Sequence, residues 1–472
     1  MLFSQGDTHL TDTTAPSNTA ATADSNIASA SEPWPSSSTA WYAMFVFIFA
    51  LFCDMFDRTI VNYVIKDIKA DFQLSDTQMG LLMGIGFALF YSVLGIPIAR
   101  LVDSKSRRVI MACGITIWSL FSAACGLCQN FWQLFIARMG VGVGEACNGP
   151  STYSMMADLF PREQLTRAAS VLQIGFVLGT GLASLASGAV IALVHTWPEF
   201  HIPGIGVMRH WQMVFMIVGL PGLLIAALMF TIQEPKRRGL IQGLHGNVAA
   251  KKAIPFKEVL KFIGENKSFY IPMYLGLAVN GLILGGQQWI PEFFRRTYHM
   301  EITQIAYIQG VVAIVFSLVG LYFGTKIGEW FIKRGHADAN LRLVVLANIL
   351  SIPIAIIYPL MPNPWLAFTF LGINMMLRFL SPGAQNAALQ SVTPNEMRGQ
   401  VTAIFLFIFN LVGYGIGPFY IGAFTDLIGA ESMLRYSLAA STAIAGPIAT
   451  FILWRAMKPY GELYKKATAW TG

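Results

Sequence analysis

Charged residues are scarce in this chain, and their scarcity excludes an ordinary soluble protein. Only 12% of the 472 residues are Asp, Glu, Lys or Arg, whereas 55% are hydrophobic. Soluble domains usually carry about 25% charged residues. The sequence therefore predicts a polytopic membrane protein.

Residues that support metal, redox or nucleotide chemistry are also few. The CxxC formed by Cys125 and Cys128 has no second Cys or His pair near it, so apolar packing is favoured over a metal or redox site. All seven histidines lie outside the apolar segments. Gly140, Gly142 and Gly144 lack the Lys-Ser/Thr of a P-loop. We therefore expect no enzyme, no metal and no cofactor.

Apolar segments of about 20 residues, the length that crosses roughly 30 Å of hydrocarbon as a helix, recur along the chain. Six precede a basic central loop and six follow it. They cover residues 41–64, 78–99, 109–128, 131–155, 168–194, 211–232, 268–291, 304–325, 341–360, 364–389, 400–425 and 433–457. The sequence predicts an all-α integral membrane protein with twelve transmembrane helices.

The net charge of +7 reflects membrane topology and not nucleic-acid binding. Of the 32 Lys and Arg residues, 23 fall in or next to loops after even-numbered segments or near the C-terminus, six fall in or next to loops after odd-numbered segments, and three lie well inside segments. The positive-inside rule places both termini in the cytoplasm. The lack of a signal peptide and of a disulfide framework suits a bacterial inner membrane, where membrane lipid is an expected partner.

Composition divides the chain into five parts. Residues 1–40 are rich in Ser, Thr and Ala without Lys or Arg, which predicts a disordered cytoplasmic tail. Two six-helix halves follow at 41–232 and 268–458, separated by a basic cytoplasmic linker at 233–267. Residues 459–472 form a second cytoplasmic tail.

An internal repeat supports a duplication of the two halves. CNGPSTYSMMADLFPRE (147–163) and LSPGAQNAALQSVTPNE (380–396) align at a constant offset of 233, which matches Pro161 with Pro394 and Glu163 with Glu396. In each half this stretch ends a fourth helix and enters a short cytoplasmic turn, as parallel six-helix halves require.

This organisation resembles the major facilitator superfamily, whose substrate site lies between the halves near the membrane midplane. The family commonly carries a gating motif, G-x-L-x-D-R-x-x-R-R/K, after its second helix. Here the motif matches at Leu101, Asp103, Arg107 and Arg108, and departs from it at Ala99 and Ser104. We expect Asp103 to cap the next helix and the two arginines to face the cytoplasmic headgroups.

Six charged side chains lie well inside the predicted segments, away from their ends. An ionisable side chain at the bilayer centre costs roughly 2.5 to 3.5 kcal/mol, so it persists mainly where it is paired or faces a wet cavity. The six are Asp54, Asp57 and Arg58 in the first segment, Arg138 and Glu145 in the fourth, and Arg378 in the tenth.

The first and fourth segments are expected to share these charges. Asp57 and Arg138 lie at a common depth, and Arg58 is one turn after Asp54. One interpretation is that the ion pairs only hold the two segments together. The other is that a carboxylate carries a proton, with Glu145 the first candidate, Asp57 the second and Asp54 beside them. In that case Arg58 and Arg138 hold an anionic group of the substrate.

The second half offers a smaller set of candidate substrate contacts. Arg378 lies mid-segment with Asn374 one turn before it, and either faces the cavity or bonds to carbonyls and headgroups. Asn280, Gln287, Asn410 and Tyr414 either contact substrate or form hydrogen bonds between helices.

Three stretches resemble the Spinster-like transporters. They are FDRTIV, RMGVGVGEACNGPSTYSMMADLFPREQLTRA and TPNEMRGQVTAIFLFIFNLVGYGIGP. The family's D-R pair falls on Asp57 and Arg58, and its R-x-G-x-G-E-A element includes Arg138 and Glu145. Asp54 stands where the family usually has Asn. The resemblance implies secondary transport of sphingosine phosphate or lysophospholipids, with protons in some members. Organic-anion symporters for hexuronates, galactonate and aromatic acids share D-R-T and G-E-A.

Taken with the resemblance, the sequence predicts a monomeric secondary active transporter that works by alternating access and is coupled to protons. Its substrate would be an amphipathic or organic anionic small molecule, lysophospholipid-like by resemblance. A proton symporter for sugar acids or other carboxylates is the alternative within this class. A non-transporting membrane receptor is the alternative from another class.

Overall fold

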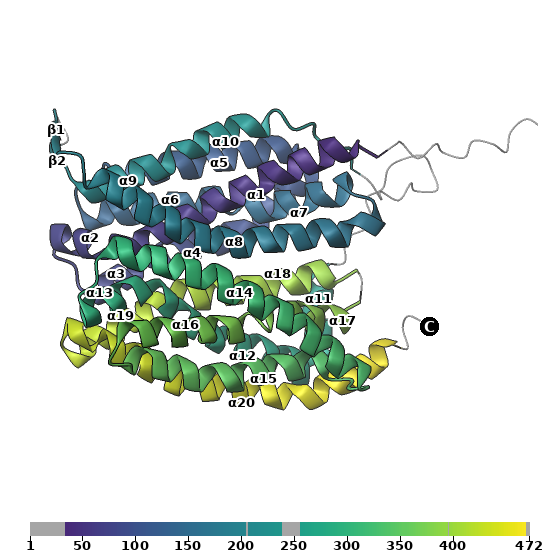
Figure 1. Cartoon of the computed structure of the whole chain (residues 1–472). Helices are drawn as coiled ribbons and strands as arrows, with labels where there is room; N and C mark the ends of the chain where they lie inside the picture. Colours follow the sequence, from purple (N-terminus) through teal and green to yellow (C-terminus); the bar gives the residue numbers. More distant parts are fainter. Residues whose placement is uncertain (1–33, 204–205, 238–254, 395, 469–472) are drawn as a thin grey trace, which may run out of the picture.

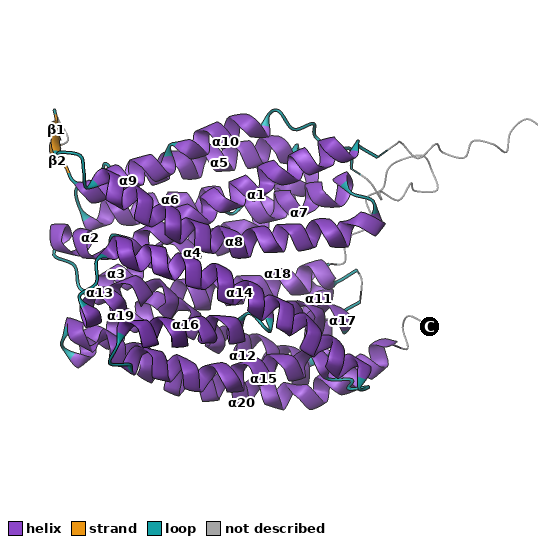
Figure 2. Ribbon diagram, in the orientation of Figure 1, coloured by secondary structure: helices purple, strands orange, loops and turns teal. Residues whose placement is uncertain are grey.

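The computed structural model describes residues 34–203, 206–237, 255–394 and 396–468, which form a helical bundle (Figures 1 and 2). Within these residues, eleven helices are long and apolar enough to cross a membrane. The remaining predicted segment, 131–155, is present as two shorter consecutive helices, α6 and α7. The protein is therefore a multi-pass membrane protein with twelve transmembrane segments, as the sequence predicts.

The N-terminal half begins with α1, whose start is capped by Ser36. A short antiparallel hairpin, β1 with β2, is the one β-sheet in the described residues. The elements are α1 (Ser37–Ile60), η1 (Val61–Tyr63), α2 (Ile65–Phe72), α3 (Asp76–Met83), α4 (Ile85–Ser104), α5 (Arg107–Cys125), α6 (Phe131–Glu145), α7 (Asn148–Leu159), α8 (Arg162–Val194), β1 (Phe200–Ile202), β2 (Gly206–Met208), α9 (His210–Gly219) and α10 (Pro221–Met229).

The C-terminal half is entirely helical in the described residues. Its eleventh segment contains a π-helical stretch, η4, between α18 and α19. The elements are α11 (Phe256–Glu265), α12 (Lys267–Gly285), η2 (Gly286–Trp289), α13 (Ile290–Tyr298), α14 (Ile302–Lys333), α15 (Ala339–Ile357), η3 (Tyr358–Leu360), α16 (Pro364–Arg378), α17 (Pro382–Ser391), α18 (Arg398–Phe409), η4 (Asn410–Ile416), α19 (Gly417–Ile428), η5 (Glu431–Met433) and α20 (Leu434–Thr468).

Some predicted boundaries differ from the structure. The first helix begins at Ser37, so the end of the predicted tail at 40 is helical. α20 continues to Thr468, beyond the predicted end of the second half at 458. The described part of the linker contains α11, which sequence reasoning did not predict. Most of the predicted tail, and residues 238–254 of the linker, lie outside the described residues.

The repeat predicted from the sequence is visible in the fourth and tenth segments. α6 and α16 both have 15 residues, and their bounds differ by the same offset of 233. Each follows an asparagine whose side chain accepts a backbone N–H at the helix start, Asn130 in one and Asn363 in the other. Each is then interrupted and followed by a second helix, α7 or α17. The interruptions therefore belong to the duplicated architecture.

The two halves lie side by side, and α8 and α14 run along the junction (Figure 1). The start of α1 and the end of α20 lie at one end of the bundle, here called the proximal end. The hairpin lies at the opposite, distal end. Glycines bring the backbones of the halves together. A Cβ atom added to Gly84 would lie 2.1 Å from the backbone oxygen of Gly415, and a Cβ atom added to Gly181 would lie 2.8 Å from that of Gly310. Only glycine permits such approaches.

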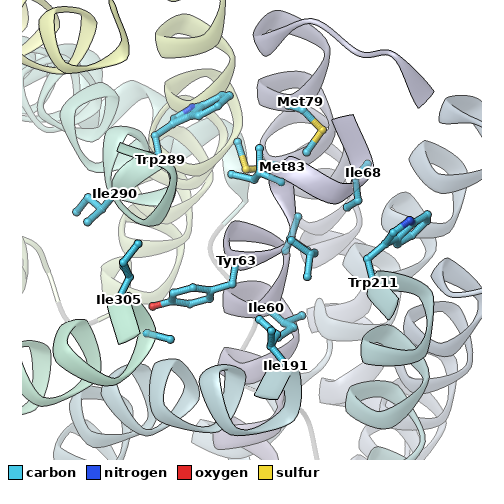
Figure 3. Close-up of a cluster of buried hydrophobic side chains, with 14 of the residues drawn as sticks. Ile60, Tyr63, Ile68, Met79, Met83, Ile191, Trp211, Trp289, Ile290 and Ile305 are labelled. Carbon is cyan, nitrogen blue, oxygen red and sulfur yellow. The ribbon is translucent and has the colours of Figure 1, made fainter. Parts of the chain in front are cut away.

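A cluster of buried apolar side chains joins the halves at the distal end (Figure 3). Met79 and Met83 from α3 belong to the same cluster as Trp289 and Ile305 from the second half. Tyr63 reaches across the junction, where its hydroxyl donates to Gln309 Oε1 at 3.2 Å. The distal end is therefore closed by packing between the halves.

Candidate functional site

The charged residues predicted in the first and fourth segments meet in the centre of the N-terminal half. Arg58 Nε lies 2.7 Å from Asp54 Oδ1, the predicted pair one turn apart, and 2.7 Å from Glu145 Oε2 on α6. Glu145 is fully buried and Asp54 nearly so. One guanidinium therefore serves two buried carboxylates.

Two aromatic rings of α4 flank the same guanidinium. The Arg58 Cζ atom lies 4.6 Å from the ring centre of Phe87 and 4.8 Å from that of Tyr91. Cations are attracted to the faces of aromatic rings at such distances. The structure therefore places two aromatic rings at the charged site.

A second ion pair lies beside the first. Arg138 Nη1 donates to Asp57 Oδ2 at 2.8 Å, which confirms the predicted pairing, and both residues are only 2% exposed. The Ser122 hydroxyl of α5 donates to the other oxygen of Asp57. Asp57 is therefore bonded through both oxygens, unlike Glu145, whose Oε1 atom is buried with no hydrogen-bond partner in the described residues.

The fourth segment is interrupted directly after Glu145. α6 ends at Glu145 and α7 begins at Asn148, whose Nδ2 atom donates to Asp54 Oδ2 at 3.2 Å. A Cβ on Gly142 would lie 2.5 Å from the backbone oxygen of Phe87, so α6 is pressed against α4 there. The interruption places a buried acid and a new helix start at the same depth.

Arg378 holds the matching place in the second half, because it is the last residue of α16. It is partly buried and lines a small cavity of mixed character, with polar groups of Gln287, Tyr358, Asn374, Ser441 and Thr442 beside apolar side chains such as Ile283 and Leu371. No carboxylate of the described residues lies within salt-bridge distance of it. The structure therefore brings together two of the predicted contacts, Arg378 and Gln287.

The other predicted contacts of the second half are spread along two helices. Tyr414 lies in η4, within electrostatic range of Asp54, Arg58 and Arg378. It is therefore near charged groups of both halves. Asn410 begins η4, whereas Asn280 is buried in α12 and is not part of the lining of the Arg378 cavity.

An ion network that sequence reasoning missed closes the distal end. Asp76 at the start of α3 accepts from Arg296 of α13 at 2.6 and 2.8 Å, and it also pairs with Lys69. Arg296 in turn donates to Glu292 at 2.5 Å, and Lys69 reaches Glu431 at 2.6 Å. Asp76 and Glu292 are each 1% exposed. These ion pairs join the two halves in a buried contact.

The segments around this network also approach closely. The Thr77 backbone and hydroxyl both donate to Asp426 Oδ2, at 2.7 and 2.6 Å. A Cβ on Gly422 would lie 2.1 Å from Asp76 O. Charges at the ends of apolar segments are ordinary in membrane proteins, so no pattern in the sequence indicates that these charges pair across the halves.

The proximal loop after the second segment is organised around Arg107. Its side chain is 1% exposed and pairs with Asp158 of α7 and with Glu234 after α10. The expectation that the Arg107 side chain faces the cytoplasmic headgroups was therefore wrong. Arg108 instead donates to Ile232 O at 3.0 Å. The predicted cap was also wrong, because Ser106 caps α5 and Asp103 is exposed within α4.

Glu234 completes the cap of α5. Its carboxylate accepts the backbone N–H groups of Arg107 and Arg108 at 3.0 and 2.9 Å and the Ser106 hydroxyl at 2.6 Å. Burial alone would raise its pKa, but these hydrogen bonds hold the pKa of Glu234 below its ordinary value. A carboxylate at a helix start also fits the helix dipole.

Comparisons with known proteins agree with this geometry. Residues 47–418 match the family described as Major Facilitator Superfamily. An MFS-type efflux pump of Mycolicibacterium smegmatis is 25% identical over 87% of this chain and 91% of its own length. A hexuronate transporter of Bacillus subtilis is 24% identical over 86% of this chain and 93% of its own length.

A solved structure shares the fold. A bacterial homologue of the human lysosomal transporter Spinster, in an inward-facing and unoccupied conformation, superposes with a TM-score of 0.73 at 24% identity. The match covers 91% of this chain and 98% of that one. This likeness shows the fold. The Spinster-like resemblance stated from the sequence is supported by a spinster homolog 1 of Xenopus tropicalis, which is 25% identical over 79% of this chain and 70% of its own length.

Proposed function

This chain belongs to the Major Facilitator Superfamily, and we propose that it couples proton movement to the transport of an organic anion by alternating access. The observation that carries this proposal is the sharing of Arg58 by Asp54 and Glu145. Two buried carboxylates beside one guanidinium hold an excess negative charge, which one proton neutralises.

Glu145 is the proposed proton carrier within this group. It is fully buried, one of its oxygens has no hydrogen-bond partner in the described residues, and it lies at the end of α6 where the helix is interrupted. Asp57 is the second candidate, although its two oxygens are bonded to Arg138 and Ser122. Protonation of Glu145 would release Arg58 from one carboxylate and leave it available to an anionic group.

Alternating access is supported by the different closure of the two ends. The distal end is sealed by the ion network of Asp76 and Arg296 and by the apolar cluster of Figure 3. Ion pairs described at the proximal end, such as Arg107 with Asp158, stay within one half. We propose that this conformation faces the cytoplasm of a bacterium through its proximal end, with both termini inside.

The substrate class we favour is an amphipathic anion of lysophospholipid type. The Spinster likeness supports it, as do the rings of Phe87 and Tyr91 beside Arg58, which suit a ligand with both apolar and charged parts. A sugar acid is the second candidate, because a hexuronate transporter is a relative over most of both chains. A receptor role has no counterpart among the matched proteins described above.

Proteoliposomes that contain a pH-sensitive dye test this function. Lysophospholipids and hexuronates are added separately to the wild type, to Glu145→Gln and to the matched control Glu163→Gln, an exposed glutamate of α8. We expect substrate-driven proton movement in the wild type and the control and its loss in Glu145→Gln.

The compounds that drive proton movement, lysophospholipids or hexuronates, identify the substrate class. Equal proton movement in all three proteins would remove Glu145 from the mechanism and direct attention to Asp57. If labelled substrate crosses while no protein moves protons, the coupling proposal is wrong.

A further inference from the structure

The net charge of the side chains inside the membrane segments is a feature that the proposed coupling does not by itself explain. Away from the segment ends, the described residues include six acidic or basic side chains. The N-terminal half has three carboxylates and two guanidiniums, which leave one negative charge when all are ionised. Arg378 in the second half supplies one positive charge. The two halves together are neutral.

Arg378 differs from the other two membrane arginines in its partners. Arg58 and Arg138 each have a carboxylate oxygen within 2.8 Å. Around Arg378 the described lining is uncharged, with Gln287, Asn374 and hydroxyl groups beside apolar side chains. A guanidinium in a low-dielectric interior costs free energy unless an anion compensates it. Because Arg378 is only partly buried, an anionic group can reach it.

The groups around Glu145 determine how one proton changes the net charge of the site. Within electrostatic range of it are charged groups of α1, a phenol of α4, an arginine of its own helix and a thiol that follows it, while a phenol of η4 is within range of the same cluster from the second half. They are Asp54, Asp57, Arg58, Tyr91, Arg138, Cys147 and Tyr414. A proton on Glu145 leaves the N-terminal cluster neutral, so the charge of Arg378 becomes the net charge of the site.

We propose that Arg378 and the polar groups of its cavity form the subsite for a single negative charge, loaded together with one proton on Glu145. This inference rests on the proposed function and adds to it the charge of the substrate and the stoichiometry. The empty site is neutral, and the site with one proton and one monovalent anion is neutral again. Both states that must change conformation across the membrane therefore carry no net charge.

The wild-type protein tests the stoichiometry without any substitution. In proteoliposomes, labelled lysophosphatidylglycerol and labelled glucuronate serve as monovalent anions from a lipid and a water-soluble source. Lysophosphatidylcholine, which has no net charge, is the matched lipid control. The membrane potential is clamped with potassium and valinomycin. We expect coupled uptake of one of the two anions, unchanged by the potential, with zero net flux when opposing proton and substrate gradients are of equal size.

Three results would overturn the inference while leaving proton-coupled transport intact. They are flux that follows the membrane potential, zero flux at unequal gradients, and equal proton-coupled uptake of lysophosphatidylcholine. Failure of the proposed function looks different, because then neither anion drives proton movement in the wild type.

Arg378→Gln and Arg378→Lys test the subsite itself. We expect Arg378→Gln to raise the KM for the transported anion about tenfold or more, as loss of a charged hydrogen-bond donor predicts, while Arg378→Lys stays close to the wild type. Thermal unfolding in detergent shows whether each variant is folded. A folded Arg378→Gln protein with the wild-type KM would remove Arg378 from the subsite.

Discussion

The fourth and tenth segments have the same architecture and opposite chemistry. Both begin after an asparagine cap, run for 15 residues and are interrupted at the same place in the repeat. The last residue before the interruption is Glu145 in one segment and Arg378 in the other. The acid lies within a network of ion pairs, whereas the base lines a cavity of uncharged polar and apolar groups.

This difference shows which features of a duplicated fold are retained and which diverge. Helix length, cap and interruption follow from the backbone, and they are the same in both halves. The charge at the interruption depends on one side chain and its partners, so it differs without changing the fold. In the N-terminal half the membrane arginines Arg58 and Arg138 are held by carboxylates of the protein, whereas Arg378 of the second half has no carboxylate partner among the described residues.

The largest expected effect on stability comes from removing Arg138, and the matching substitution in the second half removes Arg378. Arg138→Leu leaves Asp57 buried without its cation, and loss of one partner from a buried pair costs about 3 to 5 kcal/mol. Arg378→Leu removes a cation that has no carboxylate partner among the described residues, so we expect little loss or a small gain of stability. Thermal unfolding in detergent measures both.

The double variant Asp57→Leu with Arg138→Leu sharpens this contrast. Replacement of a whole buried pair by apolar side chains is often neutral, so the double variant should recover most of the stability that Arg138→Leu loses. Equal destabilisation by Arg138→Leu and Arg378→Leu would show that the two arginines are held alike, and would contradict the comparison.

A smaller effect is expected where the halves meet. Asp76→Asn weakens the bonds to Arg296 and Lys69 and should favour opening of the distal end by about 1 to 3 kcal/mol, the usual range for coupling between conformations. Distances between spin labels at the distal ends of the two halves report the opening. Asp338→Asn, which alters an ion pair within one half, is the control and should leave these distances unchanged.

Sequence reasoning predicted the features that depend on local pattern. Twelve segments followed from length and hydropathy, and the pairs Asp54 with Arg58 and Asp57 with Arg138 followed from helix geometry and depth. The repeat offset of 233 came from two short matches and agrees with the bounds of α6 and α16. These features need no knowledge of how the halves pack.

Features that depend on packing between distant segments were missed. The network of Asp76, Arg296 and Glu431 joins residues more than 100 positions apart, and each charge alone looked like an ordinary segment end. Glu234 was read as part of a basic loop, although it caps α5 from more than 100 residues away. Asp103, in contrast, matched a family motif, yet the cap belongs to Ser106.

The smallest expected effect concerns the proximal starts of α5 and α15. Glu234→Gln removes a carboxylate that holds Arg107 and the first N–H groups of α5, and we expect a loss on the order of 1 kcal/mol at neutral pH. Asp338→Asn affects the more exposed pair with Arg342 at the start of α15 and should cost less.

The pH dependence distinguishes these two substitutions. Hydrogen bonds lower the pKa of Glu234 in the folded protein, so its contribution is complete above the unfolded pKa and is lost as the pH falls through the folded pKa. The difference in unfolding temperature between the wild type and Glu234→Gln should therefore shrink on acidification. A difference in unfolding temperature that stays constant down to low pH would mean that the carboxylate charge of Glu234 does not stabilise the start of α5. The helix starts of the two halves would then not differ in this respect.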